Sequence, residues 1–410
     1  MATTYSFINE SPIVNDIATA LELIASESSA NIHDYYTIRK IVRDGKADKY
    51  FDIGDKISMK WNDGNNHDYD MVWDVVDIAN VVNEDGDTVP GLWLQSHWAL
   101  PGVQFDASEA IYYCESALPA GTYYFTIGTN WGTHCVADSS YSFTTTQAVP
   151  VGGQIVVGRN NEFYTWGAPD YDPSTWRVHT FDSASSITPI ETNLTLTAGT
   201  GGTNLGTVAS NIAYGNSGPN NLQRAAYGYN RWSQSGIRQW LNSDGNAGAW
   251  WESKNVYDRP PQQLSSLRGF MAGLPTDFLD VVAPVQVVTA LNTVSDSAFG
   301  NTETTVDKFF LPSLEQEYIT PQLASVEGAY WPYWKQRMNL NSPQGWYSDN
   351  ANTFHIRYAI ENHASAQSVR LRSAYRGHAH LTWHVTATGN VVHSGTAAYS
   401  LMVAPACVIC

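Results

Sequence analysis

The sequence is poor in charged residues, and in basic residues above all. Lys and Arg number 22 against 39 Asp and Glu, which gives a formal net charge of −17, and charged residues make up only 15% of the 410-residue chain. Nucleic-acid binding requires a track of basic side chains that neutralises phosphates, and no basic cluster occurs along the chain. A function in binding DNA or RNA is therefore not expected.

Cysteines and long apolar stretches are also scarce. The four cysteines are too few for a disulfide framework in a chain of this length, which indicates folding in a reducing cytosol. Cys114 and Cys135 would pair only in an oxidising medium. No stretch approaches the roughly 18 apolar residues of a membrane-spanning helix, and the first ten residues lack the basic and apolar parts of a signal peptide. Neither membrane insertion nor secretion by a signal peptide is expected.

Aromatic residues, by contrast, are abundant. The chain contains 15 Trp and 23 Tyr, and aromatic residues make up 12% of it. With so little charge, the polar surface must come from Asn, Ser, Thr, Gly and Tyr, a composition typical of adhesive or ligand-displaying proteins. The length allows two or three domains with substantial cores.

Residues 1–49 predict a helix followed by a strand. Ser11 can cap the helix, Pro12 suits its first turn, and the helix should end near Ser28. Its apolar residues recur at helical spacing, at Ile13, Ile17, Leu21 and Ile24. The helix would either pack against its own domain or attach the protein to an oligomer axis or a larger assembly. Residues 36–42 alternate like a strand.

The middle of the chain predicts strands separated by turns. A meander is expected within 50–106, with strands over 53–61, 71–78 and 91–98. The composition of 107–210 shifts to Thr, Ser, Gly and Tyr, which predicts an all-β module of sandwich type. Its expected strands cover 122–127, 141–144, 154–157 and 192–197.

Short helices are expected again in 211–410. Ile237, Trp240 and Leu241 share one face of a helix over 233–242, and two further amphipathic helices are expected over 277–282 and 313–318. After residue 365 the pattern predicts strands to the end of the chain.

Charged residues almost vanish near the C-terminus. Between Ser373 and Leu401 the only charged residue is Arg376, and Lys, Glu, Gln and Met are absent. Selection for solubility does not explain this gap. Most of the residues present are ones that an AAT or AAC codon can encode after its adenines are randomised. Trp383 is the exception and is interpreted as a core residue. This pattern suggests a diversified surface.

Histidines concentrate in the same part of the chain. Six of the 11 histidines follow residue 350, at His355, His363, His378, His380, His384 and His393. A metal site is one interpretation, but no carboxylate or cysteine accompanies them between 373 and 401. Exposed strand or loop histidines are therefore favoured, and neither a metal nor a cofactor is expected.

Several motifs of the second half resemble proteins with the C-type-lectin fold. They lie at 227–233, 237–242, 269–271, 309–313, 369–374, 383–385, 389–391 and 403–409. The chain resembles the variable target proteins of diversity-generating retroelements and related phage and prophage proteins. The resemblance covers roughly 50–106 and 211–410, which implies that 107–210 is an insertion. The expected fold is α+β and β-dominated, with a C-type-lectin-like domain, an inserted sandwich-type module and an N-terminal helix.

The resemblance also implies a rigid scaffold that exposes tolerant side chains on one face. By matching position, this face would consist of Tyr375, Gly377, His378, His380, Leu381, His384, Val392, His393, Ser394, Tyr399 and Leu401. All of these except Gly377 and Val392 are expected to bind ligand, with Trp383, Val385 and Val391 as the packed counterpart. Aromatic rings give a large contact area at low entropy cost. A plain solvent-exposed hairpin is the alternative.

Together these features predict a structural protein of a bacteriophage or prophage particle, made in the host cytoplasm, that adheres to a host surface protein or glycan. The N-terminal region would contact other virion proteins, and a homo-oligomer, by analogy a trimer, is expected. The alternative is a purely architectural component, such as a capsid decoration, head-fibre or tail protein.

Enzymatic activity is not expected. The same fold family includes formylglycine-generating enzymes and related oxidases, but Cys407 and Cys410, although spaced as CxxC, lie among apolar residues. No GxSxG, HExxH or P-loop motif occurs. The sequence leaves glycosidase chemistry open, because that chemistry needs only two carboxylates. Residues 63–70 offer oxygen ligands without the register of an EF-hand, so a turn is favoured over a calcium site.

Overall fold

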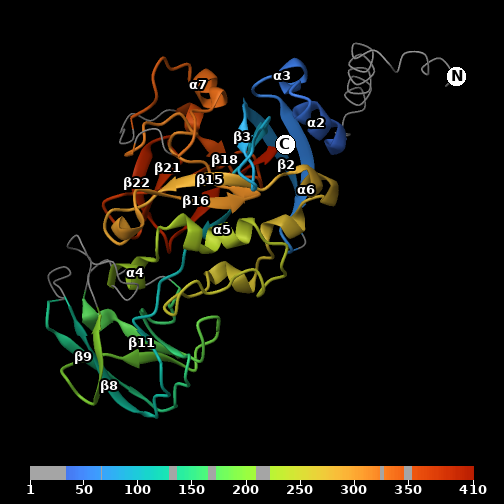
Figure 1. Ribbon diagram of the computed structural model, residues 1–410. Helices are drawn as coiled ribbons and strands as arrows, with labels where there is room; N and C mark the ends of the chain where they lie inside the picture. Colours follow the sequence, from blue (N-terminus) through green and yellow to red (C-terminus); the bar gives the residue numbers. More distant parts are fainter. Residues whose placement is uncertain are drawn as a thin grey trace, which may run out of the picture.

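The structure is a computed structural model that describes residues 34–65, 67–128, 136–164, 172–208, 222–323, 327–345 and 353–410. Strands dominate and the helices are short, so the prediction of a β-dominated α+β fold is confirmed. A larger body contains two five-stranded sheets, and the region 107–208 projects from one end of this body (Figure 1). The helix expected over 11–28 lies outside the described residues, as does Cys135.

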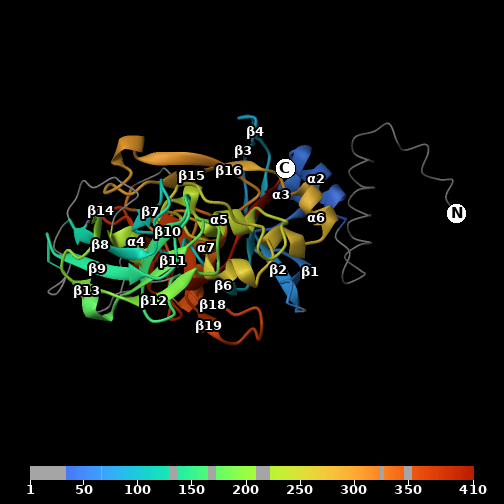
Figure 2. The same ribbon diagram turned by 90° about the horizontal axis from the view of Figure 1, so that it is seen from below.

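The first sheet of the body combines the two ends of the described chain. Its order is β1-β2-β5-β24-β17, with bounds β1 Lys56–Asn62, β2 Asp68–Ile78, β5 Leu92–Ser96, β24 Ala406–Ile409 and β17 Phe309–Phe310. Strands β1, β2 and β5 form the predicted antiparallel meander. The hairpin of β3 (Val81–Val82) and β4 (Thr88–Val89) interrupts it and stands at the edge of the body (Figure 2).

The second sheet carries the C-terminal segment singled out above. Its order is β22-β21-β20-β23-β6, with bounds β22 Val391–Thr396, β21 Leu381–Val385, β20 Val369–Ala374, β23 Ser400–Val403 and β6 Leu100–Gln104. The strands expected after residue 365 are confirmed. Because β6 pairs with β23 and β5 with β24, the segments before and after 107–208 share both sheets. Two hairpins complete the body, β15 (Val285–Ala290) with β16 (Thr302–Asp307) and β18 (Arg357–Tyr358) with β19 (Ala366–Gln367).

The strand expected over 36–42 is wrong, because these residues belong to helix α2 (Tyr35–Arg43). Its buried residues are Tyr35, Ile38, Ile41 and Val42, a helical spacing that the alternation of apolar residues concealed. Asp34 caps the helix by accepting a hydrogen bond from the Tyr36 backbone N–H at 3.1 Å. Tyr35 packs edge-on against Phe278 of α6 (Thr276–Val281), so tertiary contact supports the helix.

Two of the three helices expected in the second half are confirmed. They are α5 (Gly236–Leu241), which buries Ile237, Trp240 and Leu241, and α6. The helix expected over 313–318 is wrong, because the chain makes one turn there, with a Glu317 N–H to Ser313 carbonyl bond of 3.2 Å. Tyr318 then takes a left-handed conformation (φ 58°), which ends the turn.

The remaining helices are short. The α-helices are α3 (Ala47–Tyr50), α4 (Leu222–Tyr227) and α7 (Pro332–Met338). Single 3₁₀ turns occur at Pro173–Thr175, Trp232–Gln234, Gln262–Ser265, Phe270–Gly273, Ser297–Phe299 and Thr353–His355. Within the described residues, no helix is long and apolar enough to span a membrane.

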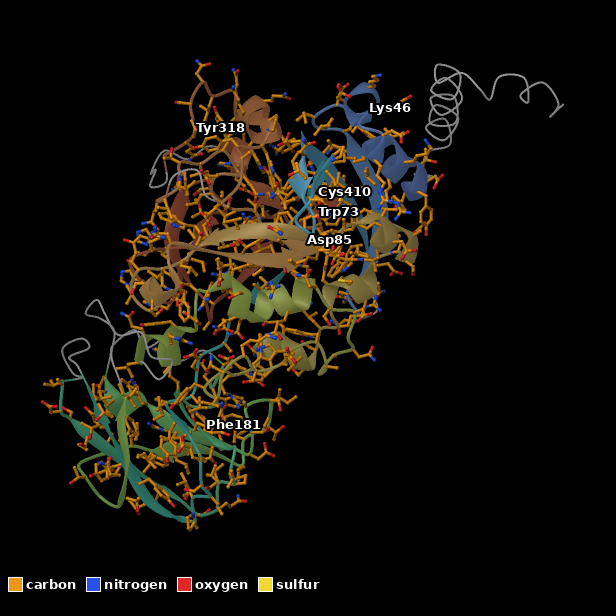
Figure 3. All side chains as sticks on the ribbon, viewed as in Figure 1. Lys46, Trp73, Asp85, Phe181, Tyr318 and Cys410 are labelled. Carbon is orange, nitrogen blue, oxygen red and sulfur yellow. The ribbon has the colours of Figure 1, made fainter. Side chains whose placement is uncertain are left out.

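The region 107–208 contains two four-stranded sheets, with orders β12-β11-β10-β7 and β13-β9-β8-β14. Their bounds are β7 Tyr112–Tyr113, β8 Gly121–Ile127, β9 Ser140–Thr145, β10 Gln154–Gly158, β11 Arg177–Phe181, β12 Glu191–Thr195, β13 Thr197–Ala198 and β14 Thr203–Val208. The strands expected over 122–127, 141–144 and 154–157 are present, whereas the one expected over 192–197 is divided between β12 and β13, which belong to different sheets. Apolar residues of both sheets share one buried cluster, separate from the tryptophan-rich core of the body. Figure 3 places Phe181 in this region and Trp73 in the body.

Candidate functional site

One face of the second sheet packs, around Trp383, against the segment that follows β17. Leu371, Trp383, Val385 and Val391 are buried and cluster with Leu314 and Ile319. The predicted packed counterpart of the C-terminal face, Trp383, Val385 and Val391, is therefore buried and forms the base of this face.

Three of the predicted ligand-binding residues gather over this base and form a ring cluster, defined as Tyr375, His378 and His393. The Tyr375 ring stacks on His393, with centroids 4.1 Å apart, and on His378, at 5.2 Å. Trp383 meets Tyr375 and His393 edge-on, at 5.7 and 5.2 Å. All three residues of the ring cluster are half-buried, so each keeps a solvent-accessible part.

The ring cluster is an aromatic surface with little charge. Burial, and secondarily His393, lowers the pKa of His378, and burial lowers the pKa of His393. Both imidazoles therefore favour the neutral form at neutral pH, in which each ring offers one hydrogen-bond donor and one acceptor. This arrangement can stack a flat ligand and orient its polar groups.

The expectation that His380 and His384 are exposed is wrong. Each is only 7% exposed. His380 stacks on Tyr227 of α4 at 4.8 Å, and burial lowers the pKa of His380 and of His384 to about 3. His384 follows Trp383 in β21, so it points to the opposite face of the sheet, where it pairs with Arg370 of β20.

The other predicted residues do not join this stack. Gly377, Leu381, Val392 and Leu401 are half-buried, and Ser394 is exposed. Tyr399 is 61% exposed on the turn between β22 and β23. Its carbonyl accepts a hydrogen bond from Arg370 Nη2 at 2.5 Å. The predicted set therefore divides between the two faces of the sheet and its turns.

Asn230, a residue that no sequence pattern assigns to the site, holds the loop that carries Tyr375 and His378. Its buried Nδ2 donates to the carbonyls of His378 at 2.8 Å and Leu381 at 2.7 Å. Its backbone N–H donates to the Ala379 carbonyl at 2.9 Å. In turn, Asn292 donates to Asn230 Oδ1 at 2.9 Å. The motif at 227–233 marked this position, but only its tertiary contacts reveal what the side chain does.

Replacing Asn230 with alanine should lower the free energy of unfolding by about 1–3 kcal/mol, because buried carbonyls lose their donor. Urea unfolding measures this loss, and hydrogen exchange at Ala379 and Leu381 should rise. Asn80→Ala, at an exposed position, is the matched control and should change neither quantity. Unchanged exchange in the loop would contradict the assigned support.

The cysteine pair does not have the environment of a reactive thiol. Cys407 lies in β24 within the main core, and burial raises the pKa of Cys407 well above its ordinary value. Burial also raises the pKa of Cys410, and both cysteines are free. A reactive cysteine needs an accessible thiolate, which buried protonated thiols do not supply.

In the oxygen-rich loop 63–70, the Asp63 carboxylate makes hydrogen bonds that stabilise the turn of the loop itself. The Asp63 carboxylate accepts hydrogen bonds from the backbone N–H groups of Asn65 at 2.7 Å and His67 at 3.4 Å. The His67 ring lies 3.1 Å from the other oxygen of the same carboxylate. These contacts agree with the turn that the sequence favoured.

A cleft of about 530 Å³ lies apart from the ring cluster. Its lining comes from α2, the loop between β3 and β4, the end of α6 and the C-terminal residue, and includes Arg39, Arg43, Lys308 and Cys410. Lys308 is already bound to the Leu279 carbonyl at 2.9 Å, and Arg39 to that of Asp280 at 3.0 Å. The cleft therefore does not extend the predicted ligand-binding face.

Comparison with known proteins assigns no activity. Residues 208–410 match the family described as "Domain of unknown function (DUF6273)". The matched part begins at the last residue of β14 and includes α4, Asn230 and the ring cluster. No curated protein and no solved structure matches the chain.

Proposed function

We propose that this protein is a non-enzymatic binding protein of a bacteriophage or prophage particle, and that the ring cluster is the centre of its ligand-binding surface. The observation that carries the proposal is the stack of Tyr375 between His393 and His378, half-exposed above a buried base. Aromatic anchors on a rigid scaffold are typical of binding hot spots.

The proposed fold is a C-type-lectin-like domain formed by 50–106 and 211–410, interrupted by a sandwich-type module over 107–210. The shared sheets of the body and the separate core of 107–208 support this division. Residues 1–49 would attach the protein to other virion proteins and build a homo-oligomer, with a trimer as the proposed state. Low charge, abundant aromatics and the resemblance described above support a place on a virion.

The proposed ligand is a host surface glycan or protein that presents a flat face to the ring cluster. Neutral imidazoles can exchange hydrogen bonds with hydroxyl or amide groups while the rings provide contact area. The exposed Ser394, which follows His393 in β22, would extend this surface. Display of several copies on a particle would raise the overall affinity.

A bacterial glycan array and a displayed peptide library test this proposal. The purified chain should bind a subset of either, and His378→Ala and His393→Ala should each weaken binding by at least about tenfold, as expected for loss of a hot-spot residue. The fold of each variant is checked by circular dichroism. Tyr358→Ala, which removes an exposed ring on β18, is the matched control and should leave binding unchanged.

Two outcomes would overturn the proposed function. One is binding that both histidine variants retain in full. The other is an oligomer in which cross-links place Tyr375 and His378 in a subunit contact, which would support the architectural alternative instead.

A further inference from the structure

Three buried carboxylates meet where the region 107–208 joins the body. Asp106 and Glu109 follow β6, and Asp258 lies in the turn after Asn255. Their side chains are 3%, 1% and 4% exposed, respectively. Each supplies one oxygen to a group in which all three oxygens lie within 4.8 Å of one another. Among the described residues, this is the group of side chains placed to share one metal ion.

The charge of this acidic group is only partly balanced. Arg224 of α4 is buried and donates from Nε to Glu109 Oε1 at 3.0 Å, and its Nη2 donates to the same oxygen. With all three carboxylates ionised, the group and Arg224 together would have a net charge of −2, which one divalent cation would neutralise. Burial raises the pKa of all three carboxyls, so their ionised forms are unfavourable without a cation. An uncompensated charge of this size is costly in a protein interior.

Glu109 provides an independent sign of a ligand. Its Oε2 is buried and accepts no hydrogen bond of normal geometry within the described part of the chain, although the Asn255 amide also interacts with this carboxylate. Buried carboxylate oxygens are otherwise satisfied in folded proteins. Asp258 Oδ2 accepts hydrogen bonds from the backbone N–H groups of Lys254 at 2.6 Å and Asn255 at 2.9 Å. Its Oδ1 accepts one bond, from the Asn255 side chain at 2.5 Å, and keeps a second lone pair for a cation.

We propose that Asp106, Glu109 and Asp258 bind one Ca²⁺ ion, which fastens the region 107–208 to the body. An all-oxygen ligand set suits hard cations. Ca²⁺ binds oxygen at about 2.3–2.6 Å, so two of its ligands lie up to about 5 Å apart, whereas Mg²⁺ at about 2.0–2.1 Å needs a tighter group.

The position of the acidic group explains why a cation there would have a structural effect. Asp106 and Glu109 begin the connection that leaves β6, and Arg224 lies on α4, where the chain returns to the body. Backbone bonds already join these segments, from Glu109 N–H to the Arg224 carbonyl at 3.2 Å and from Ala110 N–H to the Tyr257 carbonyl at 2.8 Å. A shared cation would add a link between the same segments. This inference is independent of the proposed function.

Calorimetric titration of the full chain, first stripped with EDTA, tests the site with CaCl₂ and with MgCl₂. One Ca²⁺ should bind per chain, more tightly than Mg²⁺, and saturating Ca²⁺ should raise the thermal unfolding midpoint by several degrees. Terbium provides a second readout, because neighbouring aromatic rings sensitise its luminescence and Ca²⁺ should displace it.

Asp258→Asn and Asp106→Asn should each weaken Ca²⁺ binding at least tenfold, whereas Asp85→Asn, on the exposed turn between β3 and β4, should not. The wild-type titration needs no variant to fold: absence of Ca²⁺ binding at millimolar concentration would overturn the site and leave a protonated, arginine-paired network. Binding retained in full by folded Asp258→Asn and Asp106→Asn would place the ion elsewhere and also overturn it.

Discussion

Replacing Arg372 with methionine is expected to lower the free energy of unfolding by about 3–5 kcal/mol, as for loss of one partner from a buried charged network. Arg372 lies in β20 and is fully buried, and burial lowers its pKa to about 10, so it stays charged at neutral pH. Its guanidinium donates to Leu311 O at 2.8 Å, Val288 O at 3.1 Å and Thr289 Oγ1 at 3.2 Å, and also to Gln316 Oε1 and Glu327 O.

This loss should be large because a single side chain satisfies acceptors from separate segments. Its partners belong to β15 and to the connection after β17, so Arg372 ties both to the second sheet. Methionine fills similar space but leaves these oxygens without a donor, at a cost of about 1–3 kcal/mol for each one that water does not reach.

Urea unfolding monitored by tryptophan fluorescence measures the effect. Arg177→Met is the matched control, because Arg177 is half-buried and donates only to nearby carbonyls, those of Ser174 and Trp176. The control should change stability by less than about 1 kcal/mol. Equal losses in the two variants would contradict the importance assigned to the network of Arg372.

Replacing His380 with phenylalanine is expected to make the protein less sensitive to acid than the wild type. Burial, and secondarily the imidazole of His378, lowers the pKa of His380 to about 3 in the folded protein. The unfolded chain protonates a histidine near pH 6.5. Between these two pH values the unfolded state binds a proton that the folded state excludes, so His380 lowers stability as the pH falls.

The size of this effect follows from linkage. Below about pH 6.5 the variant should gain about 1.4 kcal/mol over the wild type for each pH unit, until the pH approaches the folded-state pKa. Phenylalanine retains a ring for the stack on Tyr227 and removes an Nδ1 that has no hydrogen-bond partner within the described residues. Buried carboxyls also change the stability with pH: the raised pKa of Asp77, about 6, makes the folded state more stable as the pH falls. Both proteins contain these carboxyls, so the difference in stability between the two proteins reports the contribution of His380 alone.

Urea unfolding at several pH values between 7 and about 4.5 supplies the measurement. Phe354→Leu is the control, because Phe354 is an exposed ring without a titratable group. The control should shift stability by an amount that does not depend on pH. A difference between His380→Phe and wild type that stays constant from neutral to acid pH would contradict the burial of a neutral imidazole at this position.

The two residues in these predictions show where sequence reasoning succeeded and where it stopped. Arg372 lies in a segment correctly predicted to form strands near the C-terminus, but no pattern in the sequence marks a buried arginine with five acceptors. For His380, the resemblance by matching position predicts an exposed side chain. The structure buries it, because α4 supplies Tyr227 to cover its ring.

Errors in secondary structure have a similar origin. Residues 36–42 satisfy the alternation of a strand and the spacing of a helix, and contact between Tyr35 and Phe278 accompanies the helix. Residues 313–318 have helical spacing, but Tyr318 leaves the helical conformation where the chain continues to pair with Gln344. In both places tertiary contacts outweighed a weak local preference.

Local patterns in the sequence are enough to predict the β-dominated character, the meander, several strands of 107–208, the strands of the C-terminus and the buried position of Trp383. These depend on alternation, turn residues and apolar content, which act over a few neighbouring residues. Tertiary packing is what stacks Tyr375, His378 and His393 together while His384 faces the other side of the sheet. It also brings Asp106, Glu109 and Asp258 together. Residues so far apart in the chain come together through strand register, bulges and packing between segments, which no local pattern encodes.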